Sequence, residues 1–124
     1  MYIINFGHPF AQSTMDALEA LYPGAAHIKI GVQLEISNPS APSIEEQVLE
    51  AIRPHLAAFD GTERVAIVSP GMSNAAWVLA AHLHGLSGRF PELIELRMNA
   101  EKVFAYHRTI DLQEVRNETR KLRE

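Results

Sequence analysis

The stretch Val65-Ala66-Ile67-Val68-Ser69-Pro70-Gly71-Met72-Ser73 decides the expected fold of this chain. Its first four residues are apolar and mostly β-branched, which predicts a short strand buried on both faces. Pro70 and Gly71 then turn the chain, and the apolar residues that follow Ser73 predict a helix running to about His84. A buried strand that leads through a turn into a helix is typical of a parallel sheet covered by helices.

The rest of the chain continues this alternation of strands and helices. Strands are expected at residues 2–6, 27–36, 64–69, 93–98 and, less regularly, 103–110. Helices are expected at residues 13–21, 43–56, 73–84 and from Asp111 onward, with Ser43 and Asp111 as caps and Pro54 kinking or shortening the second. Residues 27–36 alternate apolar with polar side chains, which favours an edge position. This order predicts an α/β fold, a Rossmann-like three-layer sandwich with a mostly parallel sheet, in a single domain of residues 1–124.

The composition excludes several classes of protein. The chain has 124 residues, 47% of them hydrophobic and 21% charged, so it can bury a core and is not expected to be disordered. It has no cysteine, which excludes disulfides, thiolate zinc sites and cysteine nucleophiles. The net charge of −4 argues against a broad surface for DNA or other long nucleic acids. Because neither a signal peptide nor a membrane span is apparent, we expect a cytoplasmic protein without membrane partners.

Two turns are the candidate ligand site, because ligands of open parallel sheets gather beyond the carboxyl ends of the strands. The first turn contains Gly7-His8-Pro9, and the second runs from Ser69 to Asn74. Gly71 would let the backbone approach an anion closely, and Ser73 and Asn74 would add donors at a helix N-terminus. The alternative is an ordinary strand-to-helix turn with Ser73 as its N-cap.

His8 has two interpretations as well. It could hydrogen-bond a phosphate or act as an acid or base near neutral pH, or it could simply pack on its turn. The sequence contains neither a Walker loop nor a GxGxxG fingerprint. His82 and His84 lie about 200° apart around a helix and cannot chelate one metal ion from there, so we expect neither a metal site nor a cofactor.

Two apolar features of the sequence are expected to be buried by another part of the chain or by a partner. Trp77 could stack on a base, or it could pack in the core or in a subunit interface. The last helix carries a narrow stripe of Leu112, Val115 and Leu122, which its own domain or a partner would have to cover.

Four blocks of the sequence resemble a known family. They are Tyr2-Ile3-Ile4-Asn5-Phe6-Gly7-His8-Pro9, Ser69-Pro70-Gly71-Met72-Ser73, His84-Gly85 and Gly88-Arg89-Phe90-Pro91. The chain resembles the small stand-alone proteins encoded beside type III CRISPR systems, which are related to the CRISPR-associated Rossmann-fold (CARF) sensors and grouped with the ring nucleases.

The resemblance implies a homodimer that binds a cyclic oligoadenylate, most often cyclic tetra-adenylate, in a symmetric cleft. Ring nucleases cleave such rings without a metal ion, by attack of a ribose 2′-hydroxyl on the neighbouring phosphate. Carried over by position, the ligand-binding residues would be Gly7, His8, Pro9, Ser69, Pro70, Gly71, Met72, Ser73, Asn74 and Arg89, with Phe90 beside Arg89 and His8 as the catalytic candidate.

Three functions stay open at this point. A binder could lower the free level of the messenger either by cleaving it or by sequestering it, and neither turn holds a lysine or arginine that would stabilise developing charge. A structural or assembly protein that binds no nucleotide is the second possibility. The third is an unrelated small α/β enzyme that acts on a phosphorylated metabolite.

Overall fold

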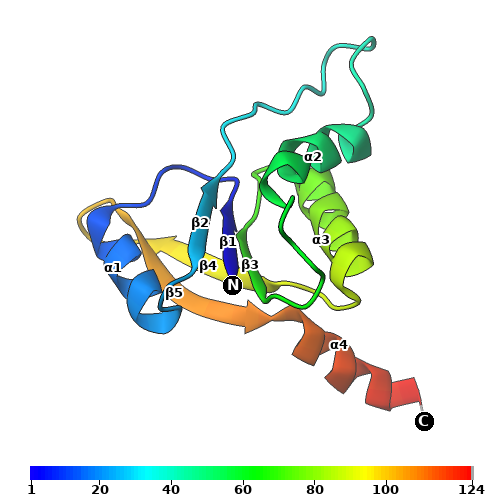
Figure 1. The fold of residues 1–124 in the computed structure, drawn as a ribbon. Coiled ribbons are helices and arrows are strands. Elements are labelled where there is room, and N and C mark those ends of the chain that lie inside the picture. The colour runs from blue at the N-terminus through cyan, green and yellow to red at the C-terminus, as the bar shows by residue number, and fades with distance from the viewer. Residues whose placement is uncertain (124) are drawn as a thin grey trace.

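The computed structural model describes residues 1–123 and contains one five-stranded sheet (Figure 1). Its strands lie in the order β2-β1-β3-β4-β5. Their bounds are β1 Tyr2–Asn5, β2 Ala26–Lys29, β3 Val65–Val68, β4 Glu92–Met98 and β5 Phe104–Asp111. The neighbours from β2 to β4 are parallel, and β5 pairs antiparallel with β4. The prediction of an α/β fold with a mostly parallel sheet is confirmed.

Helices cover both faces of the sheet and make it the middle of three layers (Figure 1). They are α1 Gln12–Leu21, α2 Ile44–Ile52, α3 Ser73–Ser87 and α4 Leu112–Arg120, with short 3-10 turns η1 Arg53–His55 and η2 Lys121–Arg123. α1 lies against one face, and α2 and α3 lie side by side against the other. No helix within residues 1–123 is long and apolar enough to cross a membrane.

The two cores follow from the two-residue period of a strand, which sends successive side chains to opposite faces. In β1, Ile3 packs with Leu18 of α1, whereas Ile4 packs with Val48 of α2 and Leu79 of α3. All five side chains are buried. β3 is therefore apolar throughout and β1 is apolar up to Asn5, because both faces of these strands are covered.

The predicted strand over residues 27–36 is too long. The structure ends β2 at Lys29, where the Ile30 amide donates to the Asn5 carbonyl oxygen, and the chain then leaves the sheet. β1 also ends at Asn5, so the residues after Ile30 have no neighbouring strand to pair with. Val32 and Ile36 are exposed in the extended arm that leads to α2. The alternation of apolar and polar side chains predicted the edge position of β2 correctly. It could not predict the length of β2, which depends on where the neighbouring strand β1 ends.

The helix ends agree with the capping and breaking signals, with one extension. Ser43 caps α2 by accepting from the Glu46 amide, and Asp111 caps α4 by accepting from the Glu114 amide. α2 ends at Ile52, just before Pro54. α3 continues past His84 to Ser87 and ends at Gly88, whose φ of 74° is the left-handed conformation that suits a glycine.

Candidate functional site

The two predicted turns begin side by side. β1 and β3 are parallel neighbours, and Asn5 at the end of β1 pairs with Val68 at the end of β3. Beyond these residues lies a groove of about 950 Å³. Five predicted site residues line it, namely Gly7, His8 and Pro9 from the first turn and Ser69 and Gly71 from the second. The sheet therefore brings together segments more than sixty residues apart at its carboxyl edge.

The first turn is held by Asn5, which is buried at the end of β1. Its Oδ1 accepts from the Gly7 amide at 2.7 Å, and its Nδ2 donates to the His8 carbonyl oxygen at 2.9 Å. These two bonds close the backbone around Phe6 in an Asx-type turn. His8 is exposed and lines the groove, which is the placement that a ligand-contacting role requires.

Gly7 lies where the first turn packs tightly against the end of β3. A Cβ at this position would lie 3.2 Å from Cγ1 of Val68 and 3.3 Å from Oδ1 of Asn5. By contrast, nothing lies within 4 Å of a Cβ placed on Gly71. Gly71 therefore leaves open space at the groove, while Gly7 permits a tight contact between β1 and β3.

The second turn differs from its prediction in detail. Met72, not Ser73, occupies the N-cap of α3, without a side-chain cap, and packs against the core. Pro70 is buried, and Ser73 and Asn74 are exposed at the start of α3, outside the groove lining. Asn74 Oδ1 accepts from the Ala75 amide at 2.8 Å. The apolar Met72 side chain packs against the core, and the helix begins at Ser73, one residue earlier than a Ser73 cap would place it.

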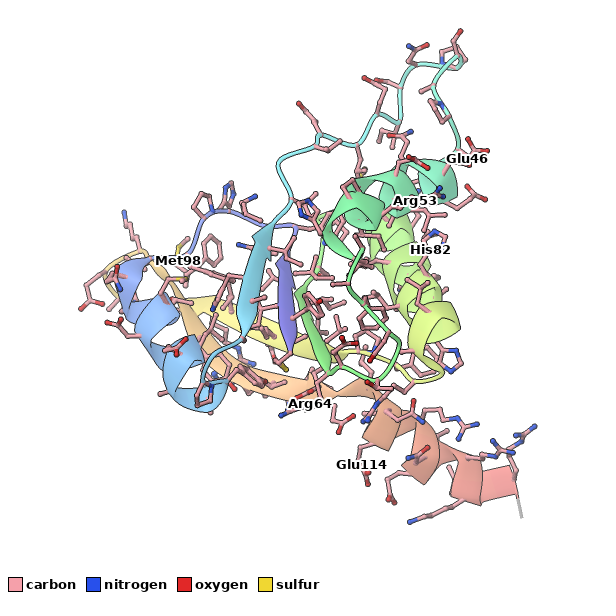
Figure 2. All side chains as sticks on the ribbon, viewed as in Figure 1. Glu46, Arg53, Arg64, His82, Met98 and Glu114 are labelled. Carbon is pink, nitrogen blue, oxygen red and sulfur yellow. The ribbon has the colours of Figure 1, made fainter. Side chains whose placement is uncertain are left out.

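Arg89 does not line this groove. It follows the carboxyl end of α3 and borders a small hollow with Glu63, Arg64 and Phe90, at the amino edge of the sheet. α3 runs opposite to the strands, so the loop after it returns to the edge where the strands begin. Figure 2 labels both edges, with Arg64 just before β3 and Met98 at the carboxyl end of β4.

The remaining wall of the groove comes from β4 and β5. Cross-strand pairs Leu93–Ile110 and Glu95–Arg108 line it, together with aromatic residues that include Phe10 and Phe104. Sequence reasoning missed this wall, and the signal was the short connection at residues 99–103. A loop that short joins antiparallel neighbours. That pairing folds β5 back and carries Arg108 toward the turns.

Charges in the groove wall are paired. Arg108 Nε donates to Oε2 of Glu95 at 2.6 Å, and an Arg97 Nη2 lies 3.4 Å from the other carboxylate oxygen. The hydrogen bond from Arg108, and then the charges of Arg108 and Arg97, lower the pKa of the Glu95 carboxyl. Glu95 is therefore ionised at neutral pH, and the trio carries one net positive charge.

The other candidate residues lie elsewhere. Trp77 is 79% exposed on α3, so it does not pack in the core. His82 Nε2 lies 2.8 Å from the Glu45 carbonyl oxygen and bridges α3 to α2 (Figure 2). Within residues 1–123, no three histidine, aspartate or glutamate side chains are close enough together to hold a metal ion.

The site thus consists of a partly apolar groove with glycine-containing turns on one side and a paired arginine on the other. Such a combination of apolar surface and a few polar groups suits an organic anion. No protein-family profile, curated protein or solved structure matches the chain.

Proposed function

We propose that this chain binds a cyclic oligoadenylate, such as cyclic tetra-adenylate, in the groove at the carboxyl edge and thereby lowers its free level in type III CRISPR signalling. The observation that carries the proposal is the groove itself. It joins Gly7 and His8 to Ser69 and Gly71, the turns on which the sequence resemblance rests.

The lining suits the two chemical parts of such a ligand. Aromatic side chains such as Phe10 and Phe104 offer surfaces on which a base can stack. Phosphate groups can be met by backbone amides near the start of α3, and by Arg108.

A homodimer fits both the ligand and the surface of the chain. A ring of four identical nucleotides has symmetry that a two-fold dimer can match with two equal grooves. α3 starts at the groove and contains no Asp, Glu, Lys or Arg. Its exposed residues Trp77, Ala81 and Gly85 recur every four positions and so share one face. An uncharged face with an exposed tryptophan is typical of an interface centre.

The direct test is to mix the protein with labelled cyclic tetra-adenylate in EDTA and to divide the sample. One half is run on a native gel, and the other is denatured and resolved into cyclic and linear forms. Retardation of an intact ring indicates sequestration and removes the catalytic role from His8. Linear product indicates metal-independent cleavage. If the ring is neither retarded nor cleaved, the proposal is wrong for this ligand.

A matched pair of glycine variants locates the binding. Gly71→Asp places a carboxylate at the groove, and Gly31→Asp places one in the arm after β2, and neither position has an atom within 4 Å of an added Cβ. Repulsion between the new carboxylate and the ligand phosphates should weaken binding about tenfold or more in Gly71→Asp. Gly31→Asp should bind as the unaltered chain does. Equal affinities for the two variants would show that the ligand binds outside this groove.

A further inference from the structure

Arg108 occupies a special position in the β4–β5 hairpin. The register of the two strands shifts between Glu95 and Leu96, so that Glu95 faces Arg108 while Leu96 faces Tyr106. His107 is the extra residue on β5. Such a bulge redirects the side chains beside it and is common next to functional sites. Here it keeps Arg108 opposite Glu95, and both residues line the groove.

The Glu95 carboxylate is shared by two arginines. Arg108 donates to one oxygen at 2.6 Å and Arg97 approaches the other at 3.4 Å. The Arg97 side chain is 62% exposed and does not line the groove. Glu95 therefore keeps a cationic partner if Arg108 turns away from it.

Arg108 retains donors for a ligand. Its side chain is 59% exposed, and within residues 1–123 only its Nε makes a hydrogen bond. The terminal nitrogens of a guanidinium form a fork that matches two oxygens of a phosphate group. Among the residues that line the groove, Arg108 is the one lysine or arginine.

We propose that Arg108 is the phosphate-contacting residue of the groove, through the terminal nitrogens that Glu95 leaves free, and that Glu95 is its counter-ion. This inference rests on the proposed function and names the residue that recognises the ligand charge. The Glu95 carboxylate repels a phosphate that binds beside it on the same guanidinium, and Arg97 offsets part of this negative charge. Glu95 therefore sets the affinity by opposing the ligand.

Three single variants test this assignment with cyclic tetra-adenylate as the probe. Arg108→Gln should weaken binding about tenfold or more, because a charge-assisted hydrogen bond is lost. Glu95→Gln should strengthen binding, because the competing charge is removed while the side-chain shape is kept. Arg97→Gln is the matched control, since it removes the same charge from the same carboxylate outside the groove, and it should change the affinity less than Arg108→Gln. Thermal unfolding of each variant checks that the fold is retained.

The outcomes separate this inference from the proposed function. If the unaltered chain binds the ring and Arg108→Gln behaves like Arg97→Gln, Arg108 is not the phosphate contact, although the function stands. If the unaltered chain binds no ring, the function fails and inorganic pyrophosphate becomes the probe. The Nε–Hε signal of Arg108 is then followed by NMR. A saturable shift that becomes stronger in Glu95→Gln supports the assignment, and an unmoved signal overturns it.

Discussion

Asn5 shows how one buried amide can determine the shape of a loop. The side chain is 3% exposed, and it satisfies the Gly7 amide and the His8 carbonyl oxygen at once. An alanine in its place would leave both backbone groups without these partners. Asn38 forms a similar turn by accepting from the Ser40 amide, but it does so in the exposed arm. The two asparagines differ in burial and in the number of side-chain hydrogen bonds, two for Asn5 and one for Asn38.

This difference gives a stability prediction at the residue scale. Asn5→Ala should lower the free energy of unfolding by about 1–3 kcal/mol, because two part-buried hydrogen bonds that hold the first turn are lost. Asn38→Ala should cost less than about 0.5 kcal/mol, because water replaces the lost bond at an exposed site. Urea unfolding followed by circular dichroism measures both. Similar losses in the two variants would show that burial of Asn5 is not what holds the first turn.

The individual residues of the site were only partly predictable from the sequence. Gly7, His8 and Gly71 could be placed, because buried parallel strands end at a common edge and each turn directly follows such a strand. Arg89 lies away from the groove because the loop after α3 returns to the amino edge of the sheet. Glu95 and Arg108 were missed because neither residue stands near either turn in the sequence. Their approach depends on the antiparallel pairing of β4 with β5.

At the scale of elements, local signals predicted the helix ends better than the length of β2. Ser43 and Pro54 act within one turn of the chain, and each has the predicted effect. The extent of β2 depends instead on where β1 ends. Alternation of apolar residues beyond Ile30 therefore describes an extended arm as well as it describes a strand.

Asp60 stabilises the loop between η1 and β3 in a pH-dependent way. Its carboxylate accepts from the hydroxyl and the amide of Thr62, and these bonds lower its pKa from 3.8 to about 2. Because the folded chain has the lower pKa, the carboxylate stabilises the fold above pH 3.8, and this contribution is lost as the pH falls toward 2.

The matching prediction compares Asp60→Asn with the unaltered chain. The unaltered chain should be the more stable at neutral pH, and the difference should shrink as the pH falls through the range between the two pKa values. Urea unfolding at a series of pH values measures this. Thr62→Val, which removes the hydroxyl donor but keeps the amide, should retain part of the pH dependence. A difference that stays constant down to pH 2 would contradict the role of Asp60.

At the scale of the whole molecule, two apolar surfaces compete as sites of self-association. One is the α3 face around Trp77, and the other is α4, which extends away from the sheet in Figure 1 and has no buried residue. Val115 and Leu122 are exposed on this helical end of the chain. The groove lies at the N-terminal end of α3, so we assign the proposed dimer to α3.

Trp77→Ser should therefore weaken the dimer about tenfold or more, because exposed tryptophans at interface centres carry much of the binding energy. Removing residues 112–124 should leave the dimer intact. Sedimentation equilibrium measures both, and the exposure of Trp77 means that its loss should not disturb the core. The opposite pattern, with assembly lost only on truncation, would favour an assembly role for α4 and remove the basis for the α3 interface.

The groove draws its lining from positions between Phe6 and Ile110, which span most of the chain. A partly folded chain that has formed only the β4–β5 hairpin or only α1 has no such groove. A ligand of this groove should therefore bind the native state alone and shift the folding equilibrium by mass action. A bound ring should raise the melting temperature and protect amides of β1, β3 and β5 together from hydrogen exchange, even though it touches only the ends of these strands.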